Sequence, residues 1–186
     1  MACAQQISLA ARLKTRWQAY ANDRRGQAAV EFALIAAPFF FLIFSLLEVC
    51  MIFIMATVLE HAVWEAARPL RTGEAQQAGM TEVQFRNRLC SELFEIMECD
   101  ARLSLDVRTV SNFAASPIGA PIDGDGNLDN EDFRFEPGGP NDIIAVRAFY
   151  EWKLITPLMS KPLANMAGDR HLLQSSTVFR NEPFGS

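Results

Sequence analysis

Two carboxylates, Glu31 and Glu48, stand in the most apolar part of the sequence. From Phe32 to Leu59, Glu48 is the only charged residue. A charged side chain at the centre of a membrane helix costs about 2.5–3.5 kcal/mol or more, so such acids are expected to have partners. For Glu48 the sequence leaves two interpretations open: a polar partner on the helix of another subunit, or a position near the outer membrane surface. By position alone, Glu31 is an acid that reaches the lipid headgroups.

The apolar stretch is long enough to cross a bilayer, for which a helix needs about 20 residues. We predict a helix over 27–68 that spans the membrane at about 32–58, bends at Pro38 and ends before Pro69. A cleavable secretory signal fits poorly because its apolar core has only about 7–15 residues. Basic residues dominate before the span and place the N-terminus in the cytoplasm and residues 69–186 outside it: Arg12, Lys14, Arg16, Arg24 and Arg25.

The exported part is predicted to be a small α+β domain. After a linker at 73–79, apolar spacing indicates a helix over roughly 80–98, capped by Thr81. Alternation then predicts strands with short connections, which favours an antiparallel sheet of three to four strands; these strands are 103–110, 142–156 and 172–181. A long Gly/Pro/Asp-rich excursion, 114–141, separates the first two strands, and loops of this length are usually functional or mobile.

Cys90 and Cys99 lie nine residues apart in the exported domain. If 80–98 were wholly helical, they would be about 13 Å apart along the helix axis, too far for a disulfide. A bridge therefore requires the helix to end before Cys99. Export to an oxidising compartment favours the bridge, and two free thiols are the alternative.

Nucleic-acid binding and catalysis are not expected. The net charge of −5 provides no basic patch for nucleic acid. His61 and His171 are far apart in the sequence and form no zinc motif, and Ser175 and Ser176 have no recognisable base. We expect no enzyme activity, no cofactor and no metal ligands.

One acidic segment, 123–132, does resemble a calcium loop. Oxygen-bearing side chains occupy alternate positions there, as calcium loops require: Asp123, Asp125, Asn127 and Asp129. The pattern also calls for glycine at the sixth position and glutamate at the twelfth, where this sequence has Leu128 and Arg134. A solvated loop is therefore favoured, and a calcium-dependent exported binding module is kept as an alternative function.

The segment from Gly26 to Glu31 carries a family resemblance. A basic leader, a glycine, four residues, a glutamate and an apolar helix resemble the type IV prepilin processing site. The longer pattern resembles the TadE-like family of the tight-adherence (Flp) pilus system, and it is met at Gly26, Glu31, Phe32, Ala33, Pro38, Ala66, Ala67 and Arg68.

The resemblance implies a minor pseudopilin, pilin-like in fold, that takes part in assembling a tight-adherence pilus at the bacterial inner membrane. A prepilin peptidase would cut between Gly26 and Gln27 and remove the leader, 1–26. Glu31 would then pair with the new N-terminal amine of a neighbouring subunit. The partners implied are this peptidase, other pilus subunits along the helix and the lipid bilayer. An unprocessed bitopic envelope protein, which tethers or senses through its exported domain, is the main alternative.

Overall fold

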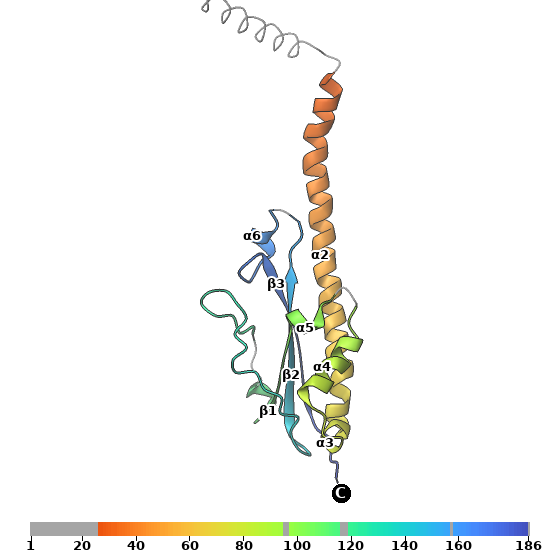
Figure 1. Cartoon of the computed structure of the whole chain (residues 1–186), viewed down its shortest axis with the longest axis vertical. Coiled ribbons are helices and arrows are strands. Elements are labelled where there is room, and N and C mark those ends of the chain that lie inside the picture. Colours follow the sequence, from red (N-terminus) through yellow and green to blue (C-terminus); the bar gives the residue numbers. More distant parts are fainter. Residues whose placement is uncertain (1–25, 95–96, 116–118, 157, 186) are drawn as a thin grey trace, which may run out of the picture. The chain divides into compact units, whose positions relative to one another are not determined.

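The computed structural model describes residues 26–94, 97–115, 119–156 and 158–185. The predicted basic leader, apart from Gly26, lies outside these residues. The chain divides into two compact units, 1–44 and 45–186. In the first unit the described residues are helical; the second is an α+β domain (Figure 1).

Helix α2, Gln27–Thr72, belongs to both units and has 46 residues. Its apolar and alanine-rich sequence contains Pro38 and Pro69, and the helix continues through both. The predicted end before Pro69 was wrong. The helix ends instead at Gly73, which adopts a left-handed conformation (φ 82°), the usual C-terminal stop. A side chain at Gly73 would also overlap the ring of Phe184, which packs against this turn.

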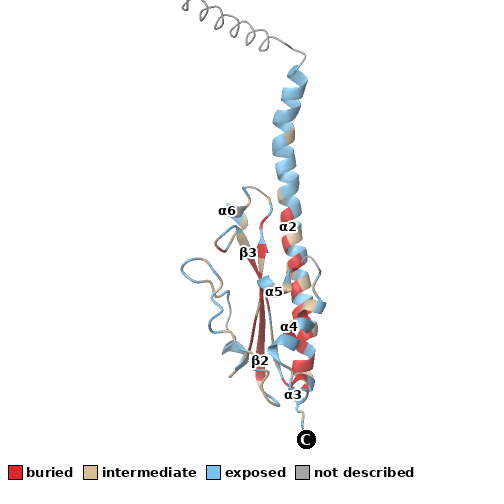
Figure 2. Ribbon diagram, in the orientation of Figure 1, coloured by how far each residue is buried: buried red, intermediate tan, exposed pale blue. Residues whose placement is uncertain are grey.

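Three strands form one antiparallel sheet, as predicted, and their order is β1-β2-β3. They are β1 (Leu103–Val110), β2 (Ile143–Lys153) and β3 (Arg170–Arg180). The apolar face of the sheet and the C-terminal part of α2 share one core, with Leu59, Val63 and Val146 almost fully buried. Figure 2 shows this core as a red stripe on α2 and along β2.

Short helices complete the domain: α3 (Glu74–Gln77), α4 (Glu82–Ser91), η2 (Phe113–Ala115), α5 (Cys99–Arg102) and α6 (Ser160–Leu163). Thr81 caps α4 as predicted, in a reciprocal capping box with Gln84. The predicted helix over 80–98 was too long, because i→i−3 hydrogen bonds of Glu92 and Leu93 tighten and end α4. The predicted linker at 73–79 contains α3.

Part of the excursion at 114–141 packs on the second face of the sheet, and part of it pairs with the edge of β1. Phe133 stacks on Phe149 of β2, with ring centroids 5.3 Å apart. The backbone of Val107 donates to Arg134 O and accepts from Glu136 N, both at 2.7 Å. This cover corrects the expectation of a half-buried β1 with polar residues outward, because Asp106 lies completely buried beneath it.

Candidate membrane and assembly site

The predicted processing bond lies at the start of α2. Gly26 and Gln27 are both exposed, and Gln27 is the first residue of the α-helix. A β-carbon added at Gly26 would meet no heavy atom within 4 Å. Among the described residues of the first compact unit, therefore, none packs against Gly26.

Glu31 lies one helical turn after Gln27 and is exposed. Its Oε1 atom accepts a hydrogen bond from Gln27 Nε2 at 2.9 Å. The i, i+4 spacing brings the two side chains to the same helix face. The first residue after the predicted cut and the predicted pairing acid are thus neighbours in space.

The helix after Glu31 exposes an almost unbroken apolar surface. Phe32 and Leu34 are each 71% exposed, and Ile35 is 70% exposed. Aromatic rings contact one another along the helix, with Phe39–Phe40 centroids 5.6 Å apart and Phe40–Phe44 centroids 6.3 Å apart. Among the described residues, α2 is the one helix long and apolar enough to cross a membrane. It is therefore compatible with a single-pass membrane anchor.

Glu48 is buried, with 6% of its surface exposed, and its carboxylate binds the backbone of the same chain. Oε1 accepts from Ile155 N at 2.5 Å, and Oε2 accepts from Thr156 N at 2.7 Å. Two charge-assisted hydrogen bonds of this kind compensate a carboxylate for lost hydration. Neither interpretation of the sequence included this contact, because an acid and two backbone amides more than 100 positions later leave no local signal.

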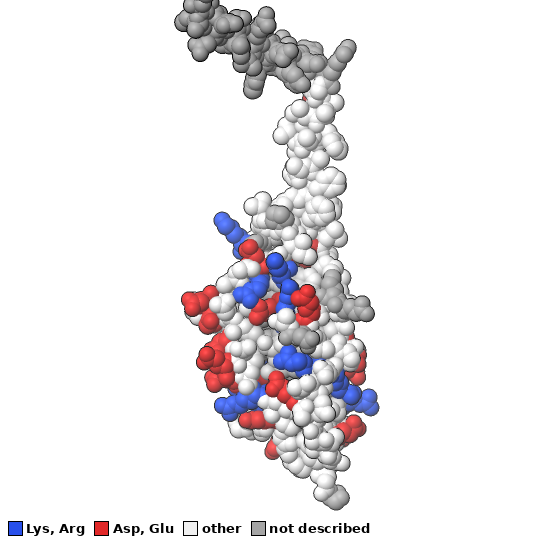
Figure 3. Space-filling model, viewed as in Figure 1, with Lys and Arg blue, Asp and Glu red and all other residues white. Residues whose placement is uncertain are grey.

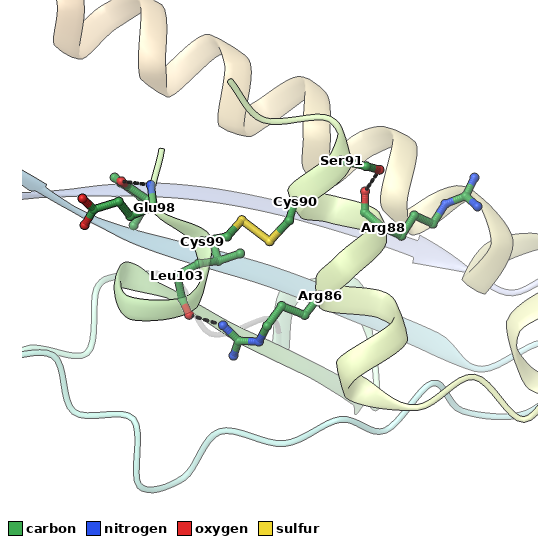
Figure 4. Close-up of a disulfide and its surroundings, with 8 residues drawn as sticks. Arg86, Arg88, Cys90, Ser91, Glu98, Cys99 and Leu103 are labelled. Atoms are coloured by element: carbon green, nitrogen blue, oxygen red, sulfur yellow. Dashed lines mark hydrogen bonds between the residues drawn. A yellow bond between two sulfur atoms is a disulfide. The ribbon is translucent and has the colours of Figure 1, made fainter. Parts of the chain in front are cut away.

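Cys90 and Cys99 are joined by a disulfide, with Cα atoms 6.0 Å apart (Figure 4). The bond ties α4 to α5, and two hydrogen bonds continue the connection to the sheet. Arg86 Nη1 donates to Leu103 O at 2.5 Å, and Glu98 N donates to the Tyr150 hydroxyl oxygen at 3.0 Å. Burial raises the pKa of the Tyr150 hydroxyl above its usual value. The remaining described cysteine, Cys50, is a free thiol.

The acidic segment at 123–132 uses its side chains for turns. Asp123 Oδ1 accepts from Asp125 N and Asn127 N, at 2.9 and 2.8 Å. Asn127 Oδ1 accepts from Arg170 Nη2 at 2.9 Å, which ties the segment to β3. Within the described part of the chain, no group of three or more His, Cys, Asp or Glu residues could hold a metal ion.

A buried ion pair that the sequence analysis missed holds the excursion to the sheet. Asp106 Oδ2 accepts from Arg147 Nε and Nη2 at 2.9 and 2.7 Å. Its Oδ1 accepts from the Arg108 guanidinium and, at 3.2 Å, from Arg134 N. Alternation had marked Asp106 as a polar position of β1. Its buried partner Arg147 stands in an otherwise apolar run of β2, and this was the available signal.

A groove runs between α2 and the edge strand β3. The helix contributes Trp64, Glu65, Arg68 and Arg71 to its lining, and the strand contributes residues 177–179. Trp64 is exposed, and the Arg71 guanidinium lies 5.9 Å from its ring centroid, a cation–π contact. The wider surface of the domain carries acidic and basic residues side by side, while the exposed part of α2 is almost free of charge (Figure 3).

These features define an α+β protein in which an apolar N-terminal helix leads into a disulfide-containing domain. Residues 26–68 match the model of a protein family described as TadE-like protein, which confirms the resemblance over this segment. The family suggests a protein associated with the tight-adherence pilus, with a structural or assembly role and contacts to other pilus components. Comparisons with curated proteins and with solved structures found no match.

Proposed function

We propose that this protein is a minor pseudopilin that takes part in assembling a tight-adherence pilus at the bacterial inner membrane. A prepilin peptidase removes residues 1–26, and the mature helix associates laterally with the helices of other pilus subunits. The exported domain selects the partner. The role is structural and requires no catalytic group.

One observation carries this proposal: the Gly26–Glu31 pattern stands at the start of a helix whose apolar surface is exposed. The family match covers the pattern, and the exposed surface extends from it to Leu47. Buried residues of α2 begin only at Glu48. A helix segment with exposed, large apolar side chains is suited to contact lipid and neighbouring helices.

Charge pairing at Glu31 gives the proposed assembly step its physical basis. Cleavage after Gly26 would turn Gln27 into an N-terminal residue with an α-amine of pKa about 8, mostly protonated at neutral pH. The amine of a neighbouring subunit would then replace the neutral Gln27 side chain as the partner of Glu31. A charge-assisted hydrogen bond is stronger than a neutral one, so this exchange favours association.

Crosslinking in native membranes tests the proposed step most directly. A photo-reactive residue at Ala28, which is exposed beside Gln27, is expected to capture another pilus subunit. Glu31→Gln should abolish this product and pilus formation, whereas Glu31→Asp, which keeps the charge, should retain part of both. A photo-reactive residue at the exposed Phe113 serves as the control position. Normal pilus numbers in a Glu31→Ala strain would refute the proposed role of Glu31.

A further inference from the structure

We propose that Ile155 and Leu158, here called the apolar tip, insert into the outer surface of the membrane that holds α2. The tip would make the exported domain a second point of membrane attachment, next to the helix. This inference rests on the membrane anchorage in the proposed function but is independent of processing and of pilus partners.

The exposure of the apolar tip is the first observation. Ile155 is 79% exposed and Leu158 is 80% exposed, more than any other large hydrophobic residue in the described chain. Leu158 also has a positive φ of 70°, a conformation that is strained for a bulky side chain and more usual for glycine or asparagine. A soluble domain gains nothing from two such side chains in water, whereas a domain beside a bilayer can bury them in lipid.

The carboxylate of Glu48 fixes the apolar tip at a defined level along α2. It holds Ile155 N and Thr156 N at 2.5 and 2.7 Å. Leu46 and Leu47, which directly precede Glu48, are exposed, whereas α2 is increasingly buried after it. One face of the helix therefore turns from exposed to buried at the level where the tip is held, while Phe53 and Ile54 remain exposed beyond it.

The length of the exposed helix segment places that level near a membrane boundary. From Phe32, the first residue after Glu31, a helix rises about 22 Å to Leu47 and about 33 Å to Ile54, so a hydrocarbon core of about 30 Å that begins at Phe32 ends about one turn beyond Glu48. Glu48 would then lie close to the outer interface, where its carboxylate accepts hydrogen bonds from Ile155 N and Thr156 N. The apolar tip would lie beside it. The position of the tip thus follows from the same residue that ends the apolar run.

Basic residues near the apolar tip suit the headgroup region. Lys153 precedes the tip at the end of β2, and Lys161 follows it in α6; both are exposed. Apolar side chains flanked by lysines are typical of surfaces that lie in the interface, where the amines meet anionic headgroups. The charge pattern therefore favours an anionic lipid surface as the occupant over an apolar protein surface.

Lipid quenching of a fluorophore at the tip tests the proposal. The full-length chain would carry Cys3→Ser and Cys50→Ser, keep the Cys90–Cys99 disulfide, and receive an environment-sensitive dye at Ile155→Cys or Leu158→Cys. The control is Phe113→Cys, an exposed apolar position that follows β1 at the end of the sheet where Val110 pairs with Ile143. Each protein is reconstituted into phosphatidylethanolamine/phosphatidylglycerol vesicles with and without spin-labelled lipid.

We expect blue-shifted emission and at least twofold stronger lipid quenching at positions 155 and 158 than at 113. Emission and quenching equal to the control, in protein that floats with the vesicles, would overturn the apolar tip while leaving the anchorage intact. Protein that fails to float would overturn both. If the dyes show solvated emission in vesicles but shielded emission in native membranes, a protein partner covers the tip, and the lipid contact is refuted.

Discussion

Helix α2 contains two apolar segments with opposite surroundings. From Gln27 to Leu47 its large side chains are mostly exposed, whereas after Glu48 one face is buried against the sheet and α4. Hydrophobicity therefore does not distinguish the two segments. The difference lies in the exposure of their side chains, and the proposed function has lipid and other subunits cover those of the first segment.

The largest effect should come from the buried ion pair on the covered side of the domain. Asp106→Ala leaves the buried Arg147 guanidinium without its carboxylate, and we expect a loss of about 3–5 kcal/mol in the free energy of unfolding. Chemical denaturation of the detergent-solubilised protein measures it. Glu136→Ala is the control, because its ion pair with Arg134 is exposed and should contribute at most about 1 kcal/mol.

Matched leucine truncations compare the two segments of α2 directly. Leu59→Ala should destabilise the domain by about 2–5 kcal/mol, because Leu59 is fully buried in the core. Leu42→Ala removes the same atoms from an exposed position and should leave the unfolding midpoint in detergent nearly unchanged. Equal losses at the two positions would show that the first segment is also packed within the chain.

Removing the disulfide should have a somewhat smaller effect. Replacing Cys90 and Cys99 together by serine releases a loop of about ten residues, which in the chain-entropy model costs about 2–3 kcal/mol. Cys50→Ser, at an exposed free thiol, provides the control. A thiol-blocking reagent should react with Cys90 and Cys99 of the wild-type protein only after reduction, which checks that the disulfide is formed. If it is formed and the double variant still has an unchanged unfolding midpoint, α5 is held by its other contacts alone.

The smallest of these effects is expected at the junction of the two segments. Glu48→Gln keeps the size of the side chain but removes its charge and one of its two acceptor oxygens, so only one of the hydrogen bonds from Ile155 N and Thr156 N can remain. Hydrogen bonds to charged groups contribute about 1.5–3 kcal/mol, so the neutral variant should lose up to about that amount. Hydrogen exchange at Ile155 and Thr156 reports the change, and Glu60→Gln at an exposed position of α2 should leave it unaltered.

Much of the fold could be predicted because it depends on local patterns. The apolar run of α2, the capping Thr81 and the alternation of β1 and β3 each follow from residues close together in the sequence. The end of α2 was misplaced because Pro69 is tolerated in a helix that Gly73 terminates. The end of α4 was misplaced because apolar spacing continued past the residues that form the helix.

The contacts between distant segments could not be predicted. Asp106 is buried only because the excursion folds back over β1, and Glu48 is satisfied only because the connection after β2 returns to α2. Neither contact leaves a local pattern. Glu48 and Ile155 are 107 positions apart, and Asp106 and Arg134 are 28 positions apart and joined by a loop without periodicity. The residues of the candidate site near Gly26 were identifiable because their spacing along one helix carries the pattern.

The mass of the mature protein tests the central claim most directly. Protein extracted from membranes of cells with an active prepilin peptidase should lack residues 1–26 and begin at Gln27, whereas protein from cells with an inactive peptidase should retain them. Replacing Gly26 should also preserve the full-length mass. A protein that begins at Met1 in the presence of the active peptidase would contradict the account and favour an unprocessed bitopic envelope protein.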